Sequence, residues 1–205
     1  QDEIRLKNFA LPADMPYKTA VGTVYDSGDF PKNLQDCLAL AKWSGFPARR
    51  DEAAGRGKLR GIGMAYYVEV TGNSPGAIKI EFQPNGRGRL SVGTLSHGQS
   101  HETTFSQIVA DQLGVPIESI DYVQGDTDRG VAGDVTGGSR SLWSSGNGIL
   151  KTCATIVAKG TEVAAEMMRA PRDGIAFEDG AFRRKGTNQF RPLWEVDEAA
   201  RETLA

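Results

Sequence analysis

Hydrophobic positions in the C-terminal two-thirds of the chain alternate with polar ones in several short runs, which is typical of strands. In "AIKIEFQ", residues 77–83, Ile78, Ile80 and Phe82 alternate with charged positions. "PNG" then turns the chain and "GRLSVGTL" returns, so a β-hairpin is expected. "GIAFEDGAFRRKG" predicts a second hairpin, "IDYVQGD" a further strand, and the apolar "LRGIGMAYYVEVTG" a largely buried strand.

Apolar residues at helical spacing predict helices elsewhere. "DEIRLKNF" predicts a short helix. A second helix is expected to start at Phe30 and Pro31, with Ser27 or Asp29 as its cap. "ARRDEAAGRG" predicts a polar helix that ends in glycine, and "PLWEVDEAARETL" a last helix. A helix over 102–113 places four apolar residues on one side, namely Phe105, Ile108, Val109 and Leu113.

A long helical pattern covers about residues 139–169, and its glycines suggest that another backbone packs closely against it. Its inner stripe is expected to contain Leu142, Gly146, Ile149, Leu150, Cys153, Ile156, Val157, Gly160, Ala164 and Met167.

Strands and helices are intermixed without a regular βαβ rhythm, so the pattern predicts an α+β fold. We expect mixed strands and hairpins packed against the long helix and shorter helices. Residues 1–58 are expected to form a helical N-terminal segment and residues 59–205 the α+β portion. Both ends fall inside helical patterns, so we expect an internal piece of a longer chain, with a missing upstream part and a truncated C-terminus.

The overall composition narrows the possible partners. A net charge of −2 gives no electrostatic reason to expect nucleic acid or a membrane surface as a partner, and no apolar run is long enough to span a bilayer. Cys37 and Cys153 lack metal-ligand spacing and lie in apolar helical patterns. They are therefore expected to be reduced core residues of a cytoplasmic protein.

Both histidines lie in "GTLSHGQSHETTF", residues 93–105. A zinc-protease motif needs a second histidine four residues after the first on one helix face, and after His101 that position holds Phe105. A structural interpretation makes Ser100 or His101 the helix cap, with Glu102 in the first turn, where the helix dipole favours a carboxylate.

A third interpretation of the same segment is a binding loop. Gly98 would let the backbone approach a ligand, and the first N–H groups of the helix, with Gln99 and Thr103, would hold an anionic or polar cofactor. The sequence alone leaves these interpretations open.

The second glycine-rich loop is "GDTDRGVAGDVTGGSRSLWSSGNG", residues 125–148. Its Gly-Gly-Ser segment would form an anion nest beside the positive charge of Arg140, or it is a solvated loop with a serine cap. Asp126 and Asp128 fit turn chemistry better than a general base or a magnesium site. The loop lacks a Walker motif, and none of its serines has a histidine nearby in the sequence.

Taken together, "GTLSHGQSHETTFSQIVADQLGVP", "IDYVQGDTD" and "TGGSRS" resemble the molybdopterin-binding large subunit of the xanthine dehydrogenase/aldehyde oxidase family. The carbon monoxide dehydrogenase type is the most similar, and the resemblance covers nearly the whole chain. It implies molybdenum held by a pterin cofactor, often the cytosine dinucleotide form. It also implies an oxidoreductase that hydroxylates an aldehyde, heterocycle or similar carbon centre, or oxidises carbon monoxide, with water-derived oxygen. Iron–sulfur clusters and FAD would lie on partner domains or subunits.

By this resemblance, two short segments would contact the cofactor. "GQSHET" matches the family's "GQGHET", which implies contacts from Gln99, Ser100, His101 and Thr103. "GSRS" matches the other contact loop, which implies contacts from Gly138, Ser139, Arg140 and Ser141. No residue of the chain is assigned as catalytic or as a metal ligand. The family's "YR" loop would precede residue 1 and its glutamate would follow residue 205, so the isolated piece is expected to be inactive.

Two other classes of function stay open. One is a non-catalytic interaction or scaffold domain that has lost the cofactor, suggested by Ser100 in place of the family's glycine. The other is an unrelated metal hydrolase that uses His97, His101 and a carboxylate.

Overall fold

The computed structural model describes residues 1–72, 76–83, 85–126, 128, 131–133 and 135–204. The chain forms two compact units, Gln1–Tyr67 (the N-terminal unit) and Val68–Ala205 (the C-terminal unit). This boundary falls later than the predicted division after residue 58, which stays a proposal. None of the described helices is both long and apolar enough to cross a membrane.

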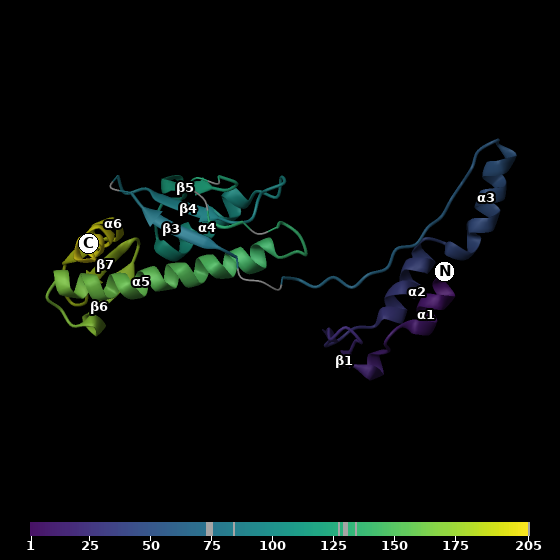
Figure 1. Ribbon diagram of the computed structural model, residues 1–205, viewed down its shortest axis with the longest axis horizontal. Coiled ribbons are helices and arrows are strands. Elements are labelled where there is room, and N and C mark those ends of the chain that lie inside the picture. The colour runs from purple at the N-terminus through teal and green to yellow at the C-terminus, as the bar shows by residue number, and fades with distance from the viewer. Residues whose placement is uncertain (73–75, 84, 127, 129–130, 134, 205) are drawn as a thin grey trace. The chain divides into compact units, whose positions relative to one another are not determined.

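The N-terminal unit consists of helices and one small hairpin (Figure 1). Asp29 caps the second of its main helices by accepting a 3.0 Å hydrogen bond from the Lys32 backbone N–H, so Asp29 rather than Ser27 is the cap. The elements are α1 (Asp2–Asn8), η1 (Pro12–Asp14), the antiparallel pair β1 (Tyr17–Lys18) and β2 (Val24–Tyr25), α2 (Phe30–Leu40), η2 (Trp43–Gly45) and α3 (Phe46–Gly55).

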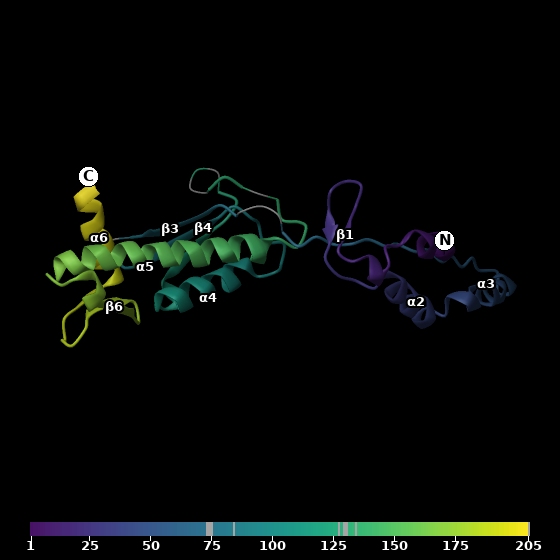
Figure 2. The same ribbon diagram turned by 90° about the horizontal axis from the view of Figure 1, so that it is seen from below.

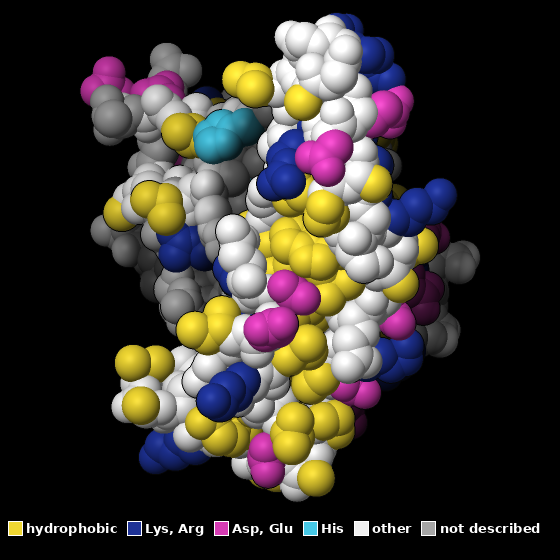
Figure 3. Space-filling view, turned by 90° about the vertical axis from the view of Figure 1, so that its right-hand side faces the viewer, with side chains coloured by type: hydrophobic (Ala, Val, Ile, Leu, Met, Phe, Trp, Pro, Cys, Tyr) yellow, Lys and Arg dark blue, Asp and Glu magenta, His cyan; other side chains and the backbone are white. Residues whose placement is uncertain are grey.

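The core of this unit is small. Leu34 and Ala53 are its buried apolar side chains among those described, and Figure 3 shows apolar side chains at the surface of the face turned to the viewer. Cys37 is exposed, so its prediction as a core residue was wrong. It borders an apolar hollow of about 250 Å³ between α2 and residues 62–66.

The predicted strand at 59–72 does not form: the described residues there pair with no strand. It is also mostly exposed rather than buried, including Leu59 and Tyr67. Tyr66 of this segment instead packs within the N-terminal unit. The centre of its ring lies 4.7 Å from that of Phe9, and its hydroxyl donates a hydrogen bond to the Phe30 carbonyl at 3.2 Å. Without a neighbouring strand, apolar composition alone does not make a ladder.

The C-terminal unit is built on a three-stranded sheet. β3 (Ile78–Phe82) pairs antiparallel with β4 (Gly88–Val92), which confirms the first hairpin, and β4 pairs in parallel with β5 (Ile120–Val123). The parallel pair requires a crossover, which α4 (His101–Leu113) and η3 (Ile117–Ser119) supply.

Helices α4 and α5 lie together on one face of this sheet (Figure 2). The core between these layers is fully or nearly fully buried, with Leu90 and Val92 from β4 and Phe105, Val109 and Leu113 from α4. The predicted apolar face of α4 is therefore confirmed.

The long helix begins later than predicted. A π-helical turn over Leu142–Gly146 precedes α5 (Asn147–Met167). Ile149, Cys153 and Ala164 are buried as expected, but Leu142 and Leu150 are exposed. The π turn is wider than an α-helical turn, so Leu142 points in a different direction from the one that α-helical spacing predicts. Leu150 lies about 100° around the helix axis from the buried Ile149, outside the face that the rest of the unit covers.

Glycines in α5 do allow close approach. A Cβ at Gly160 would lie 2.3 Å from Cζ of Phe182, so the neighbour is an aromatic ring rather than the expected backbone. At Gly148 the nearest atoms are the Ile78 side chain at 2.8 Å and the Gly76 carbonyl oxygen at 3.4 Å.

A second antiparallel sheet closes the far end of α5. β6 (Ile175–Glu178) and β7 (Ala181–Arg184) form the predicted hairpin after η5 (Arg172–Gly174), while β8 (Phe190–Pro192) was not predicted. The predicted last helix is α6 (Leu193–Leu204). The combination of small sheets and helices confirms the α+β class.

We predict that Gly160→Ala lowers the free energy of unfolding by about 1–3 kcal/mol, because the added methyl group would overpack against the buried Phe182 ring. Urea unfolding followed by circular dichroism measures this change. Gly55→Ala is the matched control: a Cβ there meets no atom within 4 Å, so an equal loss from Gly55→Ala would contradict the explanation.

Candidate functional site

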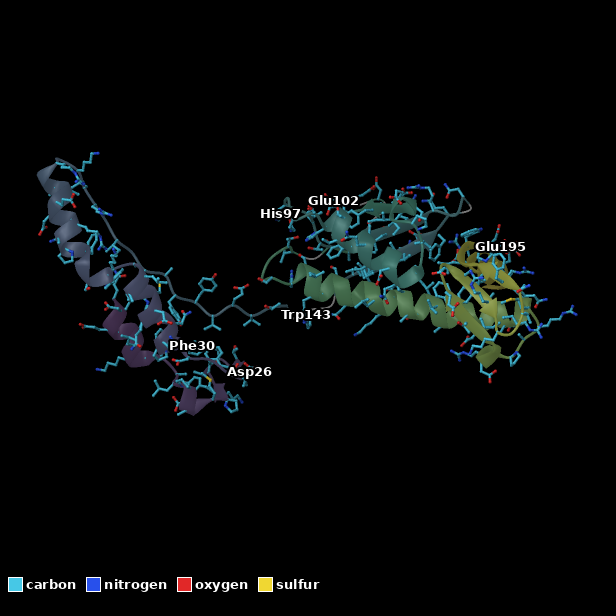
Figure 4. The ribbon with its side chains drawn as sticks, turned by 180° about the vertical axis from the view of Figure 1, so that it is seen from behind. Asp26, Phe30, His97, Glu102, Trp143 and Glu195 are labelled. Atoms are coloured by element: carbon cyan, nitrogen blue, oxygen red, sulfur yellow. The ribbon has the colours of Figure 1, made fainter. Side chains whose placement is uncertain are left out.

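A hollow of about 360 Å³ lies between the start of α4 and the loop that precedes α5. Figure 4 shows His97, Glu102 and Trp143 at this end of the C-terminal unit, opposite the end that carries Glu195. The lining residues are Gln99, His101, Thr104, Phe105, Thr136, Gly137, Ser139, Arg140, Ser141 and Leu142. The structure therefore brings the two glycine-rich loops together around one space.

Five of the eight residues expected to contact a cofactor line this hollow: Gln99, His101, Ser139, Arg140 and Ser141. Ser100, Thr103 and Gly138 do not line it. Thr104 takes the place expected for Thr103, because residues 101, 104 and 105 share one face of the helix. Helical periodicity could have identified Thr104 from the sequence. Thr136 had no such signal.

The topology of the sheet explains why the loops meet. β4 and β5 are parallel, so the loops that leave both strands lie at the same edge of the sheet. The first loop leads from β4 into α4, and the second leads from β5 toward α5. Crevices at the carboxyl ends of parallel strands are common ligand sites, because helix starts and loop amides gather there.

A chain of hydroxyl groups joins the two loops directly. The Thr94 hydroxyl, which is buried, lies 2.7 Å from that of Thr136 and 2.9 Å from that of Ser141. The Thr136 oxygen also accepts from the Leu95 N–H at 2.9 Å and its hydroxyl donates to the Leu95 carbonyl at 2.7 Å. These bonds fix the position of the second loop relative to the first.

A second brace comes from β5. The side-chain oxygen of Gln124 accepts hydrogen bonds from the Ser96 N–H at 2.8 Å and from the Tyr122 hydroxyl at 3.2 Å. Burial raises the pKa of Tyr122 to about 12, with a smaller contribution from the negative charge of Glu102. The Tyr122 hydroxyl therefore keeps its proton and stays a donor at neutral pH.

The segment Val68–Gly72 supports the second loop from another direction. The Gly72 N–H donates to the Gly138 carbonyl at 3.2 Å, and the Ser139 hydroxyl donates to the Glu69 carboxylate at 3.4 Å. A Cβ at Gly72 would lie 2.5 Å from the Trp143 ring, so only glycine allows this approach without moving the ring.

Both loops contain a non-glycine residue in the left-handed region, Ser100 with φ of 57° and Ser139 with φ of 50°. Ser100 is at the N-cap position of α4, but its side chain makes no capping hydrogen bond. The structural interpretation is therefore right about the position, since Ser100 is the N-cap residue, but its backbone is left-handed rather than extended and the usual side-chain hydrogen bond of a cap is missing. Glu102 does lie in the first turn, as expected.

His101 is the first residue of α4 and is buried, with 4% of its surface exposed. Its ring stacks on that of Phe105 at 4.8 Å, and its Nδ1 atom is buried without a hydrogen-bond partner. Burial lowers the pKa of the His101 imidazole below its usual value, which the charge of Glu102 partly opposes. The ring is therefore neutral at neutral pH, with one nitrogen unsatisfied by the protein.

Arg140 is the charged side chain among the lining residues. Its Nε and Nη2 atoms donate to the Val135 carbonyl at 2.8 and 2.7 Å, which positions the guanidinium at the hollow. The Gln99 side-chain oxygen accepts from the His97 N–H, so its amide NH₂ stays available as a donor. The described residues of the site thus present positive charge, hydroxyls and amide donors, and no carboxylate is among these described lining residues.

Metal binding by protein ligands has no support in the described part of the chain. No three His, Cys, Asp or Glu side chains lie close enough there to hold an ion, so the metal-hydrolase alternative lacks a site among these residues. The Asp126 carboxylate accepts from the Asp128 N–H at 2.9 Å, which is the turn geometry expected for this pair. Residues 127, 129, 130 and 134 of the same loop lie outside the described residues.

The fold thus places two glycine-rich loops around one polar hollow that contains a positive charge. The chain belongs to the molybdopterin cofactor-binding domain family, whose model matches residues 36–204. The resemblance inferred from the sequence motifs is thereby confirmed.

Named relatives agree with this assignment. The chain is 34% identical over 95% of its length to the carbon monoxide dehydrogenase large chain of Hydrogenophaga pseudoflava, of which it covers 26%. It is 31% identical over 87% of its length to the nicotine 6-hydroxylase large subunit of Paenarthrobacter nicotinovorans, of which it covers 23%. The chain thus spans about a quarter of these curated relatives.

Solved structures show the same fold. The Cu,Mo-CO dehydrogenase in its carbon monoxide reduced state matches 95% of this chain and 27% of its own, with 31% identity and a TM-score of 0.60. The quinoline 2-oxidoreductase from Pseudomonas putida 86 matches 98% of this chain and 27% of its own, with 26% identity and a TM-score of 0.57.

We predict that Ser100→Gly raises the free energy of unfolding by about 0.5–1 kcal/mol, because glycine adopts a positive φ without the strain of a side chain. Chemical unfolding measures the difference. Thr103→Gly, inside α4, is the matched control and should lower stability by about 0.3 kcal/mol, the difference between the helix propensities of threonine and glycine. Destabilisation by both variants would refute the strain at Ser100.

We also predict an acid-dependent loss of stability from His101. Unfolding lets this residue bind a proton below pH of about 6.5. Because its folded pKa is lower, the free energy of unfolding falls as the pH is lowered from that value, by at most about 1.4 kcal/mol per pH unit.

Urea unfolding between pH 7.5 and pH 5 measures this dependence in roughly half-unit steps. His101→Phe should remove the His101 contribution and make the dependence shallower, while His97→Gln should keep most of it, because burial is the largest cause of the lowered His101 pKa and the charge of His97 is a smaller one. An unchanged slope in His101→Phe would contradict the assignment.

Proposed function

We propose that this chain supplies part of the cofactor cradle of a molybdenum hydroxylase, with the hollow between the two loops as the cofactor site. The observation that carries the proposal is the convergence of Gln99, His101 and Ser139–Ser141 on one space. Loops held by the Thr94 and Gln124 hydrogen bonds give the preorganised geometry that cofactor sites need.

The residues around the hollow fit the chemistry of an anionic pterin cofactor. Arg140 supplies a positive charge, and the hydroxyls and Gln99 amide supply hydrogen-bond donors. His101, which lines the space, has a buried Nδ1 atom without a hydrogen-bond partner, and burial without a partner is costly. We assign the contacts to Gln99, His101, Ser139, Arg140 and Ser141, with Thr104 and Thr136 added from the structure. Ser100, Thr103 and Gly138, which the resemblance also implies, do not line the hollow.

The bound cofactor would supply the redox chemistry, namely oxidation of a small carbon substrate with oxygen from water. The chain's own residues would bind and orient it. From the resemblance we further propose the cytosine dinucleotide form of the pterin, iron–sulfur and FAD partners, and a cytoplasmic location. Because the chain spans about a quarter of its curated relatives, we propose that these 205 residues alone do not catalyse turnover.

The scaffold alternative rested on Ser100 in place of glycine. Ser100 does not line the hollow, so its side chain does not fill the space where a cofactor would sit. The φ of 57° explains why glycine is favoured at this position, and nothing in the structure explains the serine. The structure therefore gives the scaffold reading no specific support.

The test uses the polypeptide that carries this chain, purified from cells that make the cofactor. Arg140→Gln should reduce bound molybdenum and pterin by about tenfold, because a charge-assisted contact to an anion is lost. Metal analysis and pterin fluorescence after oxidation measure the content, independently of turnover.

Arg191→Gln is the matched control, because Arg191 is an exposed residue of β8, away from the hollow. Its cofactor content should equal that of the unaltered protein. Arg140→Lys should recover part of the content, since it restores the charge without the paired donors to Val135. Full cofactor content in Arg140→Gln would reject the proposed site.

A further inference from the structure

A second hollow, of about 240 Å³, lies at the other end of the C-terminal unit, between α6 and the end of β3. Figure 4 shows Glu195 of α6 at this end, with the labelled residues of the first site at the opposite end. Phe82, Trp194, Glu198 and Glu202 are among its lining residues. This hollow, here called the α6 groove, shares no residue with the site between the two loops.

The α6 groove has an aromatic side. Trp194 is 44% exposed although it is a large apolar side chain, and Phe82 beneath it is nearly buried. The Trp194 ring lies over the hairpin turn, where a Cβ at Gly86 would be 3.8 Å from it. An indole held against a turn offers one open face, which is a good surface for a methylene chain or a cation.

The other side of the groove is acidic. Trp194, Glu198 and Glu202 follow one another at four-residue intervals, so they form one row along α6. Arg201, the groove's positive residue, is already engaged: it forms an ion pair with Asp197 at 2.7 Å and donates to the Phe82 carbonyl. Among the described residues, the structure gives Glu198 and Glu202 no ion-pair partner.

The two neighbouring carboxylates of the groove are electrostatically unfavourable by themselves, and a bound cation would stabilise them. Two glutamates four residues apart on a helix repel each other, and a positive charge placed between them would relieve that repulsion. Lysine and arginine combine such a charge with an apolar stem that can lie on an indole ring. The volume of the groove suits one long side chain rather than a whole domain.

We propose that the α6 groove docks a basic segment of a partner polypeptide. One lysine or arginine side chain of that segment lies with its methylene groups on Trp194 and its charge between Glu198 and Glu202. The charge of the groove selects against nucleic acid and anionic lipid, which it would repel. Such aromatic-centred contacts with a charged rim are typical of the few residues that dominate protein interfaces.

The test follows the indole N–H resonance of Trp194 in ¹⁵N-labelled protein, assigned by its disappearance in Trp194→Phe. The probe is the peptide acetyl-Leu-Lys-Leu-amide, with acetyl-Leu-Glu-Leu-amide as the comparison. We expect a saturable shift with the lysine peptide that weakens as sodium chloride is raised, and no saturable shift with the glutamate peptide.

The variant Glu198→Gln/Glu202→Gln should weaken binding of the lysine peptide by about tenfold or more. Glu195→Gln, on the same helix but outside the groove, should change it by less than about twofold. Circular dichroism checks that α6 stays folded in each variant, and neutral glutamine keeps helix propensity close to that of glutamate.

Three outcomes would overturn the proposal. One is the absence of a saturable shift with the lysine peptide, and another is equal binding by the doubly substituted variant. The third is a concentration-dependent dimer in sedimentation experiments that the double substitution abolishes, because the occupant would then be a second copy of the chain. These results are independent of cofactor content, so they do not bear on the proposed molybdenum site.

Discussion

The parallel pairing of β4 with β5 is the constraint on which the arrangement of the C-terminal unit depends. Parallel neighbours cannot be joined by a tight turn, so the chain must cross over through a helix, and α4 is that crossover. The crossover puts the first turn of α4 and the exit of β5 at one edge of the sheet. A space between two loops then follows from the topology rather than from any single residue.

Hydrogen bonds convert that proximity into a defined site. Thr94, at the start of the loop that follows β4, contacts both Thr136 and Ser141, so one small side chain links two loops that are far apart in the sequence. Gly72 and Glu69 brace the second loop from outside. The residues that face the space are thus held by neighbours that do not face it, which is how a rigid binding geometry is maintained.

The C-terminal unit carries opposite chemistry at its two ends, separated by the length of α5. The described lining of the hollow near α4 contains Arg140 and amide donors, whereas that of the α6 groove contains Asp197, Glu198 and Glu202 around an exposed indole. An anionic cofactor and a cationic side chain are therefore drawn to different ends. Because the buried core lies between these ends, each surface can be altered without repacking the other.

The sequence by itself determined the elements whose signals are local. Alternation and turn residues placed both hairpins, the apolar face of α4 followed from its period, and the two glycine-rich motifs pointed to a family that the comparisons confirmed. Tertiary structure decided what depends on distant partners. Residues 59–72 have strand composition but no neighbouring strand, Cys37 faces an unfilled hollow, and β8 exists only because β7 offers an edge. Thr136 also depends on distant partners, because its hydroxyl forms hydrogen bonds with Thr94 and Leu95, which only the folded chain brings beside it. Local propensity is encoded within a few residues, whereas pairing, burial and hydrogen-bond partners are properties of the folded chain.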